Sequence, residues 1–177
     1  MQKQKALFLD RDGIINVDHG YVYKIEDFEF SEGIFELLHL FINKGYLLFI
    51  VTNQSGIGRE YYSVEAFNIL TVWMKENFQK RGIHIEDVQY CPHTPNEHCH
   101  CRKPHIGMIE NILTHYNIDL NASWMIGDKQ SDIELAINAN IGTSIAITEK
   151  ELKHFNYTFT SVALCTKYME ENKDKIV

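Results

Sequence analysis

The stretch Ala6-Leu7-Phe8-Leu9-Asp10-Arg11-Asp12-Gly13 decides the fold expected for this chain. Four apolar residues run without a break and stop at Asp10, as in a strand that is buried on both faces of a parallel sheet. Asp12 follows two residues later, and Gly13 tolerates the backbone angles of a sharp turn. The run therefore places two carboxylates at the sheet edge where ligands of open parallel sheets bind.

Predicted strands and helices alternate along the rest of the chain. Apolar runs predict further strands over 47–51, 123–126 and 143–147, and a fifth over 162–164. Apolar spacing, caps and glycine stops predict helices over 32–44, 63–81, 106–116 and 131–140. This alternation indicates right-handed crossovers and a three-layer α/β fold, with helices on both faces of a central parallel sheet. All 177 residues are expected to form one domain, in which about 167–177 is a solvated helix or a frayed end.

The composition excludes several classes of partner. The formal net charge is −7 and the sequence pI is near 5.7, whereas proteins that bind nucleic acids or anionic membranes are usually basic. The longest apolar runs fall far short of the roughly 20 residues of a membrane span, and the N-terminus lacks the pattern of a signal peptide. We therefore expect a cytoplasmic protein that acts on a small molecule. Without a long exposed apolar helix, a monomer is the default expectation.

Acidic residues also follow the strand predicted over 123–126. Asp128 comes directly after this strand, and Asp132 lies one helical turn further on. Parallel strands bring Asp10 and Asp128 to one edge, where close carboxylates repel each other and a hard divalent cation relieves the repulsion. Asp10, Asp128 and the main-chain carbonyl of Asp12 are the predicted Mg²⁺ ligands, and Asp132 is expected to orient them from behind.

This cluster predicts phosphate-ester hydrolysis through an aspartyl phosphate. Asp10 is the predicted nucleophile, and Asp12 is the predicted general acid and base, which protonates the leaving alcohol and later deprotonates the attacking water. Thr52, after the strand over 47–51, and Lys103 are expected to bind the phosphoryl oxygens. A single Asp-x-Asp at a strand end is commonly only a turn or a cap. The interpretation therefore depends on the several polar elements that share this edge.

A second set of residues has the spacing of a structural metal site. Cys91, His93, Cys99 and Cys101 supply three thiolates and one imidazole, a closed tetrahedral set of the kind that structural Zn²⁺ prefers. His98 or His100 could replace a thiolate, and a redox pair or unrelated surface residues are the other interpretations. A zinc loop over 91–101 would direct the two cations that follow it, Arg102 and Lys103, toward the phosphate.

The same residues resemble the haloacid dehalogenase superfamily of phosphotransferases. Its four motifs are matched by Phe8-Leu9-Asp10-Arg11-Asp12-Gly13, Val51-Thr52-Asn53-Gln54, Arg102-Lys103-Pro104 and Gly127-Asp128-Lys129-Gln130-Ser131-Asp132. The resemblance spans roughly 6–148 and implies the Rossmann-like fold of that superfamily. Ile14 stands where the family usually has threonine. The intervals between the motifs are too short for a separate cap domain.

Within the superfamily, the chain is most similar to bacterial D-glycero-D-manno-heptose 1,7-bisphosphate 7-phosphatases and to histidinol-phosphate phosphatases. Ile15-Asn16-Val17-Asp18-His19-Gly20-Tyr21-Val22 resembles the substrate loop of the heptose enzymes. The resemblance implies a sugar-phosphate substrate whose 7-phosphate is removed to give heptose 1-phosphate, a precursor of lipopolysaccharide or another cell-surface glycan. It also implies these substrate contacts: Asp18, His19, Gly20, Tyr21, Thr52, Asn53, Gln54, Ser55, Arg102, Lys103 and Lys129.

Two alternatives stay open at the level of sequence. Only five residues separate His93 from Cys99, and this short loop resembles the histidinol-phosphate branch. We favour the heptose substrate because the loop over 18–21 would contact the substrate, whereas the metal loop mainly shapes the site. The alternative outside enzymes is an interaction module built on the zinc loop, for which the acidic cluster would have no purpose.

Overall fold

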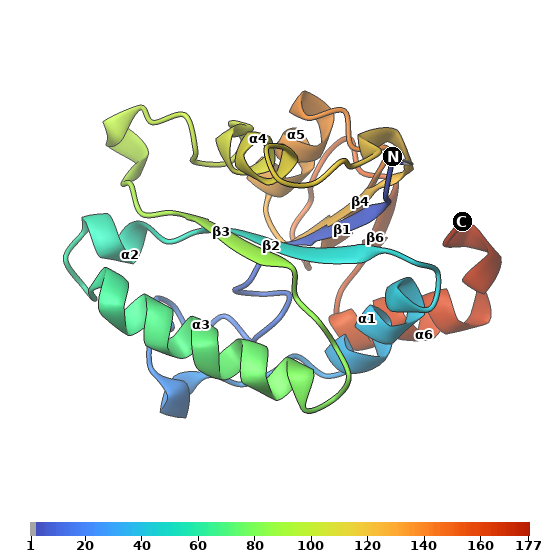
Figure 1. Ribbon diagram of the computed structural model, residues 1–177, viewed down its shortest axis with the longest axis horizontal. Coiled ribbons are helices and arrows are strands. Elements are labelled where there is room, and N and C mark those ends of the chain that lie inside the picture. Colours follow the sequence, from blue (N-terminus) through green and yellow to red (C-terminus); the bar gives the residue numbers. More distant parts are fainter. Residues whose placement is uncertain (1–2) are drawn as a thin grey trace.

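The computed structural model describes residues 3–177 and contains a single six-stranded sheet (Figure 1). All strands pair in parallel, in the order β3-β2-β1-β4-β5-β6. The strands are β1 Ala6–Leu9, β2 Leu47–Asn53, β3 Asp87–Cys91, β4 Trp124–Gly127, β5 Thr143–Ile147 and β6 Tyr157–Phe159. The predicted α/β class with a central parallel sheet is therefore confirmed.

Helices cover both faces of the sheet, as the alternating pattern requires (Figure 1). One face carries α1 Ile34–Ile42, α3 Val64–Gln79 and α6 Val162–Glu171, and the other carries α4 Gly107–Leu113 and α5 Gln130–Asn138. The single turn α2 Ser55–Gly58 follows β2 directly. Short 3-10 turns complete the regular structure: η1 Ile25–Asp27, η2 Pro95–Glu97, η3 Leu120–Ala122 and η4 Lys173–Lys175.

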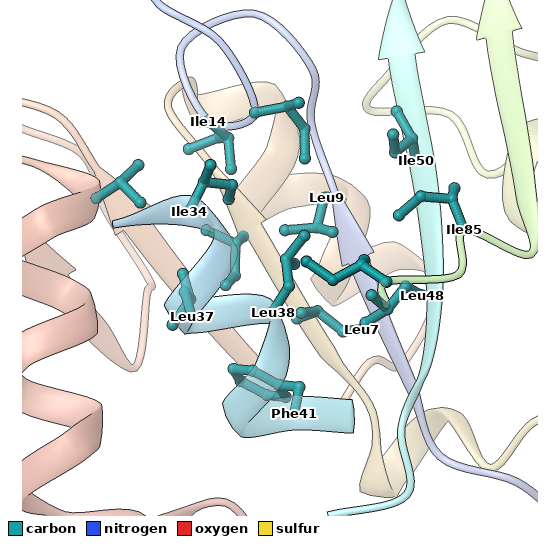
Figure 2. Close-up of a cluster of buried hydrophobic side chains, with 14 of the residues drawn as sticks. Leu7, Leu9, Ile14, Ile34, Leu37, Leu38, Phe41, Leu48, Ile50 and Ile85 are labelled. Carbon is teal, nitrogen blue, oxygen red and sulfur yellow. The ribbon is translucent and has the colours of Figure 1, made fainter. Parts of the chain in front are cut away.

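The alternation of side chains along β1 builds two separate cores. Leu7 and Leu9 point to the face of α1, and Ala6 and Phe8 point to the face of α4 and α5. On the first face, the apolar stripe of α1 packs against β1 and β2 (Figure 2). Burying both faces of β1 fixes the register of the strand, and thereby the position of Asp10 at its end.

The structure differs from the predicted elements at the sheet edges and near the C-terminus. The edge strands β3 and β6 were not predicted, because their sequences are short and only partly buried. The predicted strand over 162–164 is wrong: these residues begin α6, whose N-cap Ser161 accepts a hydrogen bond from the Leu164 amide. Residues 167–177 were expected to form a solvated helix or a frayed end; a helix does extend to Glu171, but Ile176 is buried.

This topology brings the loops after β1, β2 and β4 together at one edge of the sheet. Within residues 3–177, all six strands belong to the one sheet. Among the same residues, none of the helices combines the length and the apolar character needed to cross a bilayer. The functional site is therefore built from loops at the carboxyl edge.

Candidate active site

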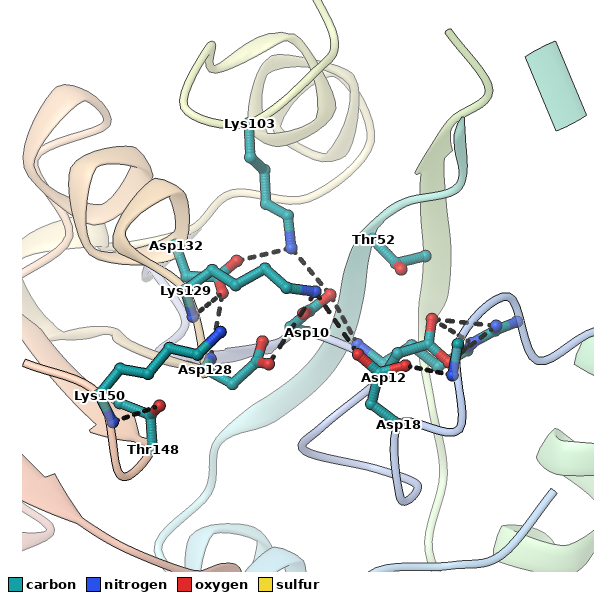
Figure 3. A network of polar contacts seen from close by, with 12 residues as sticks. Asp10, Asp12, Asp18, Thr52, Lys103, Asp128, Lys129, Asp132, Thr148 and Lys150 are labelled. Atoms are coloured by element: carbon teal, nitrogen blue, oxygen red, sulfur yellow. Dashed lines mark hydrogen bonds and ion pairs between the residues drawn. The ribbon is translucent and has the colours of Figure 1, made fainter. Parts of the chain in front are cut away.

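Side chains from three strand ends and one distant loop converge at the carboxyl edge (Figure 3). Asp10 follows β1, Thr52 lies near the end of β2, and Asp128 follows β4. Lys103 comes from the segment between β3 and α4, and its side chain extends toward Asp10 and Asp132. Residues that are up to 122 positions apart in the sequence, Asp10 and Asp132, thus share one buried cluster.

Lys103 is the buried cation of this cluster. Its Nζ lies 2.8 Å from Asp10 Oδ1 and 2.6 Å from Asp132 Oδ1, and it donates a 2.9 Å hydrogen bond to the Val51 carbonyl. Burial opposes the charge, but the carboxylates of Asp10 and Asp132 outweigh that effect and raise the pKa of Lys103 above its ordinary value. Burial likewise opposes the charge of Asp10, yet Lys103 and Lys129 lower its pKa, so both partners are ionised.

The carboxylates of Asp10, Asp128 and Asp132 lie close enough to share a cation. One oxygen of each lies within 4.8 Å of the others. Burial, followed by the negative charge of Asp10, raises the pKa of Asp128 to about 8. Its buried Oδ1 also lacks a hydrogen-bond partner within the described chain. An unpaired, desolvated carboxylate oxygen beside a second carboxylate fits a hard divalent cation.

Asp132 and two glycines hold this arrangement in place. Asp132 Oδ2 accepts hydrogen bonds from the amides of Asp128 (3.1 Å) and Lys129 (3.0 Å), while Oδ1 faces Lys103. A Cβ at Gly127 would approach the Asp132 Cβ to 2.2 Å, and a Cβ at Gly13 would approach Asp128 Oδ2 to 2.6 Å. Gly13 also has a φ of 91°. The glycines therefore permit the two acidic loops to approach each other.

Asp128→Asn is expected to stabilise the metal-free protein. In the folded chain the Asp128 carboxyl keeps its proton up to about pH 8, whereas its ordinary value is 3.8. The folded state therefore binds more protons between these values, and its stability falls as the pH rises through this window. Asparagine does not titrate, so in EDTA the variant should exceed wild type by roughly 1–3 kcal/mol above pH 8, with a smaller gain near pH 5.

Urea unfolding of both proteins as a function of pH measures this difference. Asp174→Asn, which removes an exposed carboxylate far from the cluster, is the matched control and should leave the stability unchanged. Saturating Mg²⁺ should stabilise wild type but not Asp128→Asn. Equal stability of wild type and Asp128→Asn in EDTA at every pH would contradict the conclusion that the ionised Asp128 carboxylate destabilises the metal-free protein.

Asp12 is held from two sides by side-chain donors. Arg11, which is buried, contacts both carboxylate oxygens through Nη2 at 3.0 Å. Gln54 Nε2 donates to Asp12 Oδ2 at 3.0 Å, and Asn16 Nδ2 donates to Oδ1 at 3.1 Å. The oxygens of Asp12 therefore face Arg11, Asn16 and Gln54, and they are not among the converging oxygens of the metal cluster.

A cavity of about 370 Å³ lies beside the buried cluster and shares Lys103 with it, whereas Asp10, Thr52 and Asp128 are not among the residues that line it. Its volume falls in the range of small-molecule sites. Tyr62 and Ser131, which the sequence did not single out, contribute to its wall. Ten residues that were predicted for the site also line it: Asp12, Asp18, Gly20, Tyr21, Asn53, Gln54, Ser55, Arg102, Lys103 and Lys129.

Several side chains of the site make contacts that the sequence did not predict. Asn53 braces Lys103 by accepting from its amide at 3.0 Å and donating to its carbonyl at 3.3 Å. His19, in contrast, pairs with Glu29 at 3.2 Å on the surface and is not among the residues that line the cavity. The position of Arg11 inside the Asp-x-Asp motif was visible in the sequence, but its burial and the position of its guanidinium 5.7 Å from the Phe67 ring centroid were not.

The predicted zinc ligands converge beside the cavity. Cys101 Sγ lies 2.9 Å from Cys91 Sγ, 3.7 Å from Cys99 Sγ and 3.2 Å from His93 Nδ1. All four cysteines of the chain are free thiols, so these contacts are not a disulfide. Three sulfurs and one imidazole nitrogen within 4.8 Å of one another fit a closed tetrahedral metal site. Arg102 Nη1 donates to the His93 carbonyl at 3.3 Å, which links the loop to the cavity wall.

Comparison with known sequences finds similar phosphatases. A family model described as HAD-hydrolase-like matches residues 100–154. The D-glycero-alpha-D-manno-heptose-1,7-bisphosphate 7-phosphatase of Campylobacter jejuni is 50% identical over 149 residues, which cover 84% of this chain and 86% of the relative. The D-glycero-beta-D-manno-heptose-1,7-bisphosphate 7-phosphatase of Escherichia coli is 42% identical, with 80% and 78% covered.

Comparison with solved structures gives the same fold. The crystal structure of D,D-heptose 1.7-bisphosphate phosphatase from B. bronchiseptica, complexed with magnesium and phosphate, superimposes with a TM-score of 0.81 at 22% identity. The superposition covers 95% of this chain and 99% of that one. At this level of identity the similarity establishes the shared fold alone.

Proposed function

Because the chain belongs to the D-glycero-D-manno-heptose-1,7-bisphosphate 7-phosphatase family of HAD-like hydrolases, we propose that it removes the 7-phosphate of this sugar through Asp10. One observation carries the assignment of the nucleophile. Asp10 Oδ1 accepts hydrogen bonds from Lys103 Nζ and from the Arg11 amide at 2.9 Å. These contacts hold the carboxylate in its ionised form beside Lys103, which lines the cavity.

The proposed reaction has two steps on this chain's own residues. In the first, an oxygen of Asp10 forms a bond to phosphorus while the ester P–O bond breaks, and Asp12 gives its proton to the departing oxygen. In the second, Asp12 takes a proton from water, whose oxygen bonds to phosphorus as the acyl phosphate releases Asp10. Thr52 and Lys103, which are both buried, would hold the phosphoryl oxygens during both steps.

Two metals are part of the proposal. Asp10 and Asp128 would hold Mg²⁺ together with the main-chain carbonyl of Asp12, while Asp132 stays with Lys103. When bound, Mg²⁺ screens the repulsion between a phosphate and the carboxylates. Zn²⁺ would occupy the four ligands Cys91, His93, Cys99 and Cys101 and keep the loop ordered. The set already supplies four protein ligands, so its role is structural.

The sugar and its second phosphate are proposed to bind where Asp18, Tyr21 and Arg102 line the cavity. Lys129 Nζ lies 3.8 Å from Asp18 Oδ2, which brings the loop after β1 next to the loop after β4. Asp18 and Tyr21 offer hydrogen-bonding groups for sugar hydroxyls, and the Arg102 guanidinium suits a phosphate. His19 would need to leave Glu29 in order to join them.

A side-by-side rate measurement tests the proposed substrate. With Mg²⁺, kcat/KM for heptose 1,7-bisphosphate should exceed that for histidinol phosphate by more than about 100-fold, because only the sugar fits the contacts of Asp18, Tyr21 and Arg102. The two anomers should be assayed separately, since the relatives in Campylobacter jejuni and Escherichia coli differ in this respect. EDTA should abolish turnover. A preference for histidinol phosphate would overturn the assignment. The cytoplasmic location and the monomeric state stay predictions.

A further inference from the structure

A buried chain of hydrogen bonds connects Tyr62 to the predicted general acid and base. The Tyr62 hydroxyl donates to Gln54 Oε1 at 2.5 Å. Gln54 Nε2 in turn donates to Asp12 Oδ2 at 3.0 Å and to Thr52 Oγ1 at 2.8 Å. The residues Gln54 and Tyr62 are only 2% and 7% exposed, so water competes little for these bonds.

The chemistry of the amide gives this chain a direction. Gln54 has one end that accepts and one end that donates, and the oxygens of Asp12 accept from side-chain donors in this structure. The NH2 end must therefore face Asp12, which leaves Oε1 pointing into the protein. Tyr62 supplies the donor that this oxygen needs. Without the Tyr62 hydroxyl, the buried Gln54 Oε1 would lack a hydrogen-bond partner. This cost in free energy would favour rotation of the amide away from Asp12.

The ring of Tyr62 is itself held firmly. It stacks on Tyr23 with ring centroids 5.0 Å apart and planes 9° apart. A Cβ at Gly56 would lie 2.2 Å from Cε1 of the ring, so the backbone of α2 is also in close contact with Tyr62. These contacts fix the hydroxyl next to Gln54, and Arg11 contacts both carboxylate oxygens of Asp12.

We propose that Tyr62 is a positioning residue for general acid–base catalysis, which acts through Gln54 to hold Asp12 at the leaving oxygen. This inference rests on the proposed function, because it requires Asp12 to protonate a departing alcohol. As the bond from Asp10 to phosphorus forms, the electron pair of the breaking ester bond stays on the leaving oxygen, which takes the proton of Asp12. A misplaced Asp12 would therefore slow substrates according to how much their leaving group needs that proton.

Tyr62→Phe tests the proposal, because it keeps the stacked ring and removes only the hydroxyl. The sugar phosphate leaves as an alkoxide and needs the proton, whereas 4-nitrophenyl phosphate leaves as a stable phenolate. We expect kcat/KM to fall about 5- to 10-fold for the sugar phosphate and less than about 2-fold for 4-nitrophenyl phosphate. The KM for the sugar phosphate should stay near that of wild type, since the hydroxyl is hydrogen-bonded within the protein.

Tyr23→Phe is the matched control. It makes the same substitution in the stacked partner and should leave both values of kcat/KM unchanged. An equal loss on both substrates would mean that Tyr62 is merely structural, and no loss on either would mean that Asp12 does not need it; both outcomes overturn the proposal.

Wild-type rates separate this proposal from the proposed substrate. If wild type hydrolyses another alkyl phosphate but not heptose 1,7-bisphosphate, the substrate assignment fails. The Tyr62 comparison is then made on that alkyl phosphate, with the same expected ratio. Turnover of aryl phosphates alone would remove the role of Asp12 as an acid, and the inference about Tyr62 with it.

Discussion

Asp10→Asn is expected to lower turnover by at least about 10⁴-fold and to abolish the phosphoenzyme. Asparagine keeps the shape of the side chain, but its amide is a poor nucleophile for phosphorus. The substitution also removes the charge that faces Lys103 at 2.8 Å. The fold should survive, because Lys103 keeps its second partner, Asp132, at 2.6 Å.

Acid quenching after incubation with radiolabelled substrate measures the covalent intermediate directly. Asp12→Asn is the matched control: it removes a carboxylate from the same loop, yet it should still form the phosphoenzyme from 4-nitrophenyl phosphate, which needs no strong acid. In that variant hydrolysis of the intermediate should become slow, because the base for water is missing. Turnover retained by Asp10→Asn in a well-folded sample would mean that another group is the nucleophile.

Cys101→Ser is expected to release the structural metal and to disorder the loop over 91–101. Cys101 Sγ contacts each of the other three ligands, so its substitution removes one of the four metal ligands and all three of these contacts. Between β3 and α4 the regular structure consists of one 3-10 turn, Pro95–Glu97, so the loop depends on the metal for its order. Arg102, tied to the His93 carbonyl, would lose its direction.

The expected cost is on the order of 3 kcal/mol in unfolding free energy and at least about a tenfold loss in kcat/KM, mainly through KM. Metal analysis, urea unfolding and limited proteolysis within the loop measure the three effects. Cys165→Ser is the matched control, because Cys165 is a buried thiol in the core of α6 and should leave the metal content unchanged. A zinc-free protein with full activity and a protected loop would refute the structural role.

Patterns that are local in the sequence were sufficient for the fold class and for the residues proposed to act. Each of these patterns lies within eleven residues or fewer: the apolar run that ends at Asp10, the Gly-Asp pair at 127–128 and the ligand set from Cys91 to Cys101. A buried parallel strand needs apolar residues on both faces, and a metal loop needs its ligands close together, so both requirements leave a local signature. Identity to known phosphatases then agreed with the substrate class that the loop over 18–21 had indicated.

The contacts that the predicted residues make could be determined only from the tertiary structure. Val162-Ala163-Leu164 could begin a strand or a helix, and the Ser161 cap together with packing on α1 selects the helix. Likewise, Tyr62 is linked to Asp12 through Gln54 because β1 and β2 are neighbours in the sheet, which brings the residues that follow the two strands together. Burial and hydrogen bonding depend on segments far apart in the chain, so short-range patterns determine which residues are present, and packing determines what each of them contacts.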